Sequence, residues 1–340
     1  MVLIEMVMAW AVIKRIVLPG LLSTLLITLP SNPVVASELA PSVAILDTSV
    51  DSNIFEIKGN LLHEVCILEW SVCPNGRYFL EGPGSAFLPV KYGLSATFDH
   101  GTQMASIAIS TNPSIPIVFM RIIGAAESGA RLKTSEQTVY QALEWVLDNQ
   151  VRFNIQAVAL AQGSHNLSSS KDYCPKSDRT ATAITSLFNL GIPVFVASGN
   201  NGDKSRVSWP GCLPLAIPVG AVTNGQLSSY SNIDPNRSTF LAVGETKARS
   251  SLQLQVNAFG TSVSTQVFAA MWIYLRTQLP ELSFAESMKF LKEIGRPITY
   301  QEKVGYWIDK DDLTQAVENR KYGILISSKT YIVRITRKFI

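Results

Sequence analysis

Short apolar runs that alternate with segments of helical periodicity constrain the fold of this chain more than any other feature of its sequence. Each run is rich in β-branched residues and bounded by turn residues, as is typical of a strand buried on both faces. The predicted strands cover residues 42–46, 115–123, 155–160, 193–197, 215–219 and 240–243. Helices are predicted at 136–147 and 181–190, and two more open at His100 and just after Gly260. Because strands and helices alternate, we predict an α/β fold with a doubly wound, mostly parallel sheet and helices on both faces.

The composition limits the size of the fold and the kinds of partner. A chain of 340 residues forms one large domain or two ordinary ones, and a hydrophobic content of 47% excludes global disorder. A net charge of +3 is too small to indicate a nucleic-acid partner. The charged fraction of 16% is low, which fits a large buried sheet together with an apolar leader.

Residues 1–36 have the pattern of an export signal. The basic pair Lys14 and Arg15 precedes a long apolar run, and Val34 and Ala36 satisfy the small-x-small rule for cleavage after Ala36. The head of this segment is itself apolar, which leaves open an uncleaved leader that anchors the chain in a membrane. We therefore expect an exported protein, secreted or periplasmic, with membrane contact only if the leader is retained.

Four cysteines in an exported protein predict two disulfides. Cys66 and Cys73 would close a small loop inside residues 52–95, which show no clear periodicity and which we interpret as a surface insertion. Cys174 and Cys212 would join two loops that flank a predicted strand, and the alternative for this pair is two buried free thiols. The sequence contains no CxxC pair or histidine cluster that would indicate zinc.

Three polar residues lie where folds of this class carry chemistry. Asp47 follows the first predicted strand, and the carboxyl ends of strands form the active edge of open α/β sheets. His100 opens an apolar helix, and Ser262 lies in the first turn of another, where free backbone N–H groups can hold an oxyanion. Each residue also has an ordinary explanation: an Asp that starts a turn, a structural His, and a Ser that caps a helix. It is their combination that indicates catalysis.

Four short segments, in one fixed order, resemble those of the subtilisin-like serine proteases (subtilases, peptidase S8 family). Residues 43–48 (VAILDT) are similar to the strand and turn of the catalytic Asp, and residues 100–102 (HGT) to the catalytic His block. Residues 196–200 (VASGN) resemble the segment of the oxyanion-hole Asn, and residues 260–262 (GTS) the nucleophile block. The order Asp, His, Ser differs from that of chymotrypsin-like enzymes and of α/β-hydrolases. The resemblance extends over roughly residues 42–315.

The resemblance implies a serine endopeptidase with a subtilisin-like three-layer sandwich, acting as a monomer on a peptide or protein substrate, without cofactor or metal. Ser262 would be the nucleophile, His100 its general base, and Asp47 the residue that orients His100. The Asn200 side chain and the Ser262 N–H would stabilise the oxyanion. The substrate would add as a strand to two segments, Ser128, Gly129 and Ala130, and Ala161, Gln162 and Gly163. The side chain of Gln162 would lie near the walls of the substrate pockets, in place of an apolar residue.

Several positions depart from the family pattern and support a second hypothesis. Gln103, Ser106, Val263, Gln266 and Val267 stand where the family usually has His, Gly, Met, Pro and His. These residues shape the entrances of the two helices that carry His100 and Ser262. The family's calcium-binding loop and its folding propeptide are also expected to be missing. The alternative function is therefore a catalytically impaired subtilase fold that binds peptides or partner proteins.

The predicted domain organisation has three parts. Residues 1–36 are the leader, residues 37–320 the peptidase domain, and residues 321–340 a basic, β-rich tail. We interpret the tail as a closing hairpin, and the alternative is a segment that docks on a membrane or a partner.

Overall fold

The computed structural model describes residues 39–87, 98–164, 174, 178–234, 236–237, 240–251, 254–300 and 303–323. The chain divides into two units after Ala36, and all described residues belong to the second unit. The predicted leader and residues 324–340 of the predicted tail lie outside the described residues. Among those residues, no helix has both the length and the apolar character needed to cross a membrane.

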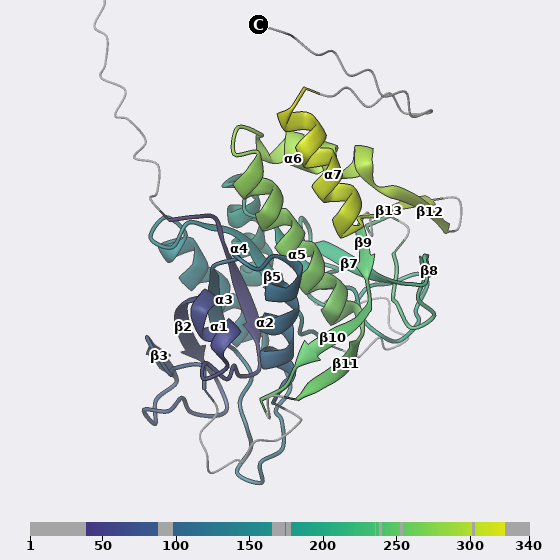
Figure 1. Ribbon diagram of the computed structural model, residues 1–340. Helices are drawn as coiled ribbons and strands as arrows, with labels where there is room; N and C mark the ends of the chain where they lie inside the picture. Colours follow the sequence, from purple (N-terminus) through teal and green to yellow (C-terminus); the bar gives the residue numbers. More distant parts are fainter. Residues whose placement is uncertain are drawn as a thin grey trace, which may run out of the picture. The chain divides into compact units, whose positions relative to one another are not determined.

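One sheet of 11 strands carries the described part of the chain (Figure 1). Its strands are β1 (Ser42–Asp47), β2 (Leu61–Ile67), β3 (Phe79–Glu81), β4 (Ile117–Arg121), β5 (Ile155–Leu160), β6 (Val194–Ala197), β7 (Ile217–Thr223), β8 (Gln226–Leu227), β9 (Phe240–Val243), β12 (Arg296–Tyr300) and β13 (Lys303–Trp307). The strand order is β12-β13-β9-β7-β6-β5-β1-β4-β2-β3, with β8 paired to β7. A separate antiparallel pair is formed by β10 (Glu245–Arg249) and β11 (Gln255–Phe259).

The inner strands of this sheet are parallel, and the antiparallel pairs are β3 with β2, β8 with β7 and β12 with β13. The central strand β1 is flanked by β4 on one side and β5 on the other, both parallel to it. Successive strands are therefore added to opposite sides of β1. Open α/β sheets bind ligands at the carboxyl edge of such a strand. The predicted fold class is confirmed.

Helices cover both faces of the sheet, because the inner strands are apolar on both sides. The helices are α1 (Phe55–Asn60), α2 (His100–Thr111), α3 (Glu136–Asn149), α4 (Asp178–Asn189), α5 (Thr261–Gln278), α6 (Phe284–Ile294) and α7 (Lys310–Lys321). Alternate residues of β1 point to opposite faces: Val43 and Ile45 pack in the core with α2 and α5, whereas Ala44 and Leu46 pack with α3 and α4.

The helix α5 is the most deeply buried of these elements. Every residue from Thr261 to Ile273 is buried, as expected of a helix that is apolar over most of its circumference. It contacts β5, β6, β7 and β9, and crosses the sheet in front of them (Figure 1). Its first turn lies at the carboxyl end of β5, where the Ser262 hydroxyl donates to the Ala161 carbonyl.

The segment that we interpreted as a surface insertion contains regular structure. The strand β2 lies within it and pairs with β4 in the main sheet, and its residues Val65 and Cys66 are fully buried. The polar pair that precedes them, His63 and Glu64, hides the strand pattern in the sequence. Glu64 is buried because its carboxylate accepts the backbone N–H groups of Gly84 and Ala86, while burial raises the pKa of its carboxyl group.

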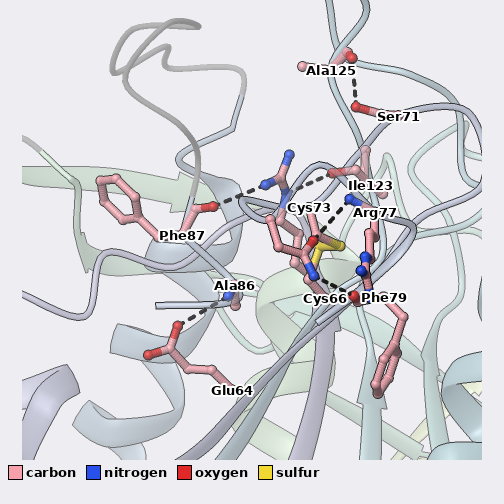
Figure 2. The surroundings of a disulfide bond; sticks show 12 residues. Glu64, Cys66, Ser71, Cys73, Arg77, Phe79, Ala86, Phe87, Ile123 and Ala125 are labelled. Carbon is pink, nitrogen blue, oxygen red and sulfur yellow. Dashed lines mark hydrogen bonds between the residues drawn. A yellow bond between two sulfur atoms is a disulfide. The ribbon is translucent and has the colours of Figure 1, made fainter. Parts of the chain in front are cut away.

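Both predicted disulfides are present, Cys66–Cys73 and Cys174–Cys212. The first closes a turn beside the end of β4, because Cys66 is the register partner of Arg121. Figure 2 shows this disulfide and the nearby hydroxyl of Ser71, which donates to the Ala125 carbonyl at 2.9 Å. Cys174 and Cys212 therefore form a disulfide and are not free thiols.

Candidate active site

Asp47 and His100 are in direct contact. His100 Nδ1 lies 2.8 Å from Asp47 Oδ1 and 3.0 Å from Oδ2, and the Thr48 N–H donates to Oδ1 at 2.6 Å. Asp47 is completely buried at the end of β1. Burial alone would raise the pKa of Asp47, but the charge and hydrogen bond of His100, the Thr48 N–H and the charge of Arg131 together lower it below its ordinary value. Asp47 is therefore a carboxylate at neutral pH.

The start of α2 is seated tightly on the end of β1. The Gly101 N–H donates to Thr48 Oγ1 at 2.9 Å, and this hydroxyl donates to the Phe98 carbonyl at 2.8 Å. A Cβ atom on Gly101 would lie 2.4 Å from the Ser49 carbonyl oxygen. Only glycine therefore allows α2 to bring His100 this close to Asp47.

Two of the departures from the family pattern have partners near this helix start. Gln103 Nε2 donates to Asp99 Oδ2 at 2.8 Å. Ser106 Oγ accepts the Arg249 N–H at 2.9 Å, which joins α2 to β10. These substitutions therefore make their own hydrogen bonds at the His100 end of the site.

Ser262 lies in the first turn of α5 and is 8% exposed. Its hydroxyl donates to the Ala161 carbonyl at 3.0 Å, at the end of β5. The next residue, Gln162, contacts both Asp47 and His100, at 2.8 Å and 2.9 Å. Two successive residues therefore connect Ser262 with the Asp47–His100 pair.

Asn200 is fixed through its side-chain oxygen. Asn200 Oδ1 accepts the backbone N–H of Thr261 at 2.8 Å and the Thr261 hydroxyl at 2.9 Å. The same hydroxyl accepts the Gly199 N–H at 3.0 Å. The amide nitrogen of Asn200 lies beside Gly260, where a Cβ atom would be 3.0 Å from it. Because Asn200 Oδ1 already accepts two hydrogen bonds, Asn200 Nδ2 is the atom that points to the start of α5, where it can donate a hydrogen bond.

The two predicted substrate segments differ in form. Ser128, Gly129 and Ala130 form a tight turn, in which the Gly129 N–H donates to the Ala126 carbonyl and the Ala130 carbonyl accepts the Ala126 N–H. Gly163 is packed against Trp209, whose carbonyl oxygen would lie 2.4 Å from an added Cβ atom.

Sequence reasoning missed Arg131 and Thr261 as parts of the site, and it gave the Gln162 side chain only a place near the substrate pockets. In the structure this side chain turns to Asp47, and Arg131 donates to its oxygen. The strands β1 and β5 pair with Leu46 beside Leu160, so the residues just after them share one edge of the sheet.

The fold and the site define a class of protein. A doubly wound α/β domain brings a buried Asp, hydrogen-bonded to a part-exposed His, to the carboxyl edge of its sheet and a Ser to the adjacent helix start, as serine hydrolases of this order do. The model of the Subtilase family matches residues 40–294, and the chain therefore belongs to the subtilase family.

Similarity to known proteins agrees with this family. The cuticle-degrading serine protease of Arthrobotrys oligospora (strain ATCC 24927 / CBS 115.81 / DSM 1491) is 30% identical over 139 residues, which are 39% of this chain and 30% of that protein. Alkaline elastase YaB of Bacillus sp. (strain YaB) is 23% identical over 189 residues, 53% of this chain and 42% of that protein. The matched region thus spans less than half of these relatives.

A solved structure supports the fold alone. The protease domain of PatA superposes with a TM-score of 0.62 at 16% identity, covering 83% of this chain and 98% of that one.

Proposed function

We propose that the chain is a serine endopeptidase that hydrolyses peptide bonds through an acyl-enzyme on Ser262. The observation that carries the proposal is the part-buried Asp47–His100 hydrogen bond at the sheet edge, where Ser262 lies in the first turn of α5. A carboxylate that holds Nδ1 of an imidazole leaves Nε2 as the atom that can accept a proton.

In the proposed reaction, His100 carries a proton first from Ser262 to the leaving amine and then from water to Ser262. In this proposal the Ser262 hydroxyl leaves the Ala161 carbonyl and donates to His100 Nε2. His100 takes its proton while Ser262 Oγ bonds to the peptide carbonyl carbon, and then delivers that proton to the leaving amine. Water next reacts with the acyl-enzyme by the same route. Asp47 holds the Nδ1–H tautomer and stabilises the imidazolium.

The negative charge on the tetrahedral intermediate needs two donors. The backbone N–H of Ser262 is free of helical bonding because it belongs to the first turn of α5. The second donor is Asn200 Nδ2, aimed by the two hydrogen bonds on its oxygen. The substrate backbone lies between residues 128–130 and residues 161–163 in this proposal.

We also propose that residues 37–320 form the peptidase domain and that the protein acts outside the cytoplasm. Two disulfides support an oxidising compartment. A protein or peptide substrate follows from the proposed chemistry, with a monomer as the acting species.

Labelling with a fluorophosphonate probe tests the proposed function. The wild type and the Ser264→Ala control should be labelled, and Ser262→Ala should not, because Ser264 lies buried on the same helix. Peptide hydrolysis should fall in Ser262→Ala by on the order of 10⁶, the loss established for the nucleophile of subtilisin. Thermal melting checks that all three proteins are folded. Labelling that persists in Ser262→Ala would place the nucleophile elsewhere, and a folded but unlabelled wild type would favour the impaired, peptide-binding alternative.

A further inference from the structure

The side chain of Gln162 is a second polar partner of the Asp47–His100 pair. Gln162 is 4% exposed and follows β5 by two residues. Its Nε2 atom donates to Asp47 Oδ1 at 2.8 Å and lies 2.9 Å from His100 Nδ1. One carboxylate oxygen therefore receives three donors, from Thr48, His100 and Gln162.

Arg131 fixes the direction of this amide. An Arg131 guanidinium nitrogen donates to Gln162 Oε1. A guanidinium has only donors and an ionised carboxylate only acceptors. With the amide reversed, its nitrogen would face Arg131 and its oxygen would face Asp47, so both contacts would be repulsive. The contacts to Arg131 and Asp47 therefore favour the orientation with Nε2 toward Asp47, although Nε2 then lies 2.9 Å from His100 Nδ1, which is a donor in the Nδ1–H tautomer.

Arg131 itself is held in place near the sheet edge. It bridges Ala125 across the turn that follows β4. Burial lowers the pKa of Arg131, and the charge of Asp47 opposes that effect. The buried Arg121, which is the β4 register partner of Asp47, donates to the carbonyls of Phe87 and Ile123. Arg131 is therefore the guanidinium whose charge acts on the Asp47 carboxylate.

We propose that Gln162, held by Arg131, is a positioning residue of the proposed peptidase reaction, which fixes the Asp47 carboxylate and shares the negative charge that would otherwise act on His100 alone. The inference rests on the proposed function. A carboxylate oxygen that already accepts other hydrogen bonds attracts each donor less strongly. Loss of either Gln162 or Arg131 would therefore leave more of the Asp47 charge to act on His100.

Steady-state kinetics against pH test this proposal in Gln162→Leu and Arg131→Met. In Gln162→Leu, kcat should fall about tenfold, the effect of one hydrogen bond to a charged group, with KM changed less than about twofold. In both variants the acidic side of the pH profile should move upward by roughly half a pH unit or more, because each removes a group that draws on the Asp47 charge.

A matched pair on the surface provides the control. Arg179 of α4 donates to Gln137 Oε1 of α3 at 3.4 Å, the same pair of residue types in an exposed place. Gln137→Leu and Arg179→Met should leave kcat and the pH profile unchanged. An unshifted acidic side in folded Gln162→Leu and Arg131→Met would overturn the proposal, because a merely structural role for the pair predicts that result.

A measurement that needs no activity separates this proposal from the proposed function. In Ser262→Ala, the proton on His100 Nδ1 should give a low-field NMR signal. Adding Gln162→Leu should move that signal further downfield, since Asp47 Oδ1 loses one competing donor. If the wild type is not labelled by a fluorophosphonate, the proposed function fails, and this signal alone then decides the role of Gln162. A signal that does not move overturns it.

Discussion

The Thr261 hydroxyl joins the start of α5 to the loop of Gly199 and Asn200, the two segments of the predicted oxyanion site. It accepts the Gly199 N–H and donates to Asn200 Oδ1, and Thr261 is itself fully buried. The orientation of Asn200 is thus set by a residue that immediately precedes the proposed nucleophile. Because Asn200 is held through its oxygen, the position of its nitrogen depends on how α5 is docked.

Replacing Asn200 by Ala should lower kcat by roughly 10² to 10³ with little change in KM, because its amide donates to charge that exists only in the transition state. Asn201→Ala is the matched control. Asn201 donates its backbone N–H to Asn232 Oδ1, and this contact does not use its side chain. Kinetics of both variants on one peptide substrate decide the assignment. A larger loss in Asn201→Ala would shift the donor by one residue.

At the scale of elements, the approach of α2 to β1 depends on one glycine. The Ser49 carbonyl and the Phe119 ring leave no room for a side chain at Gly101, at 2.4 Å and 2.7 Å from the added Cβ atom. A larger residue must push the helix start away from the sheet. The His100–Asp47 distance would then increase.

We expect Gly101→Ala to cost about 1–3 kcal/mol of stability through overpacking and to lower kcat as well. Gly59→Ala is the control, since Gly59 lies in α1 with nothing within 4 Å of an added Cβ atom. That variant should be neutral or slightly stabilising, because alanine is the better helix former. Thermal melts and kinetics of the two variants measure both effects. Equal stability of the two would show that α2 can shift without cost.

Strands and helices made of apolar residues could be predicted from the sequence. Elements and contacts that depend on buried polar residues could not. The strands β1, β5 and β6 and the starts of α2 and α5 follow from apolar runs and turn residues. The strand β2 was missed because Glu64 is buried through contacts with residues some 20 positions away. The contacts of the Gln162 side chain were not predicted because its direction depends on strand register and on Arg131, and neither is visible in a local pattern.

For the whole molecule, the two disulfides differ in what they close. The Cys174–Cys212 bond spans 38 residues, which include α4, β6 and Asn200, whereas Cys66–Cys73 spans 7. A longer loop loses more conformational freedom in the unfolded chain when it is closed. The first bond therefore constrains the unfolded chain more.

Loop-closure entropy gives about 4 kcal/mol for the longer loop and about 2 kcal/mol for the shorter. Replacing Cys174 and Cys212 together by Ala should therefore lower the free energy of unfolding more than replacing Cys66 and Cys73. Urea unfolding of the two double variants under non-reducing conditions measures the difference. An equal or reversed order would mean that native contacts, rather than chain entropy, determine the effect.

The site is assembled from positions far apart in the chain, and this sets when activity can begin. Asp47 meets His100 across 53 residues, and Ser262 meets Ala161 across 101. On the proposed chemistry, a chain that has formed β1, α2 and β5 but not yet docked α5 holds the base without the nucleophile. On that chemistry, each newly made copy acquires the capacity to cut only on completing its own fold.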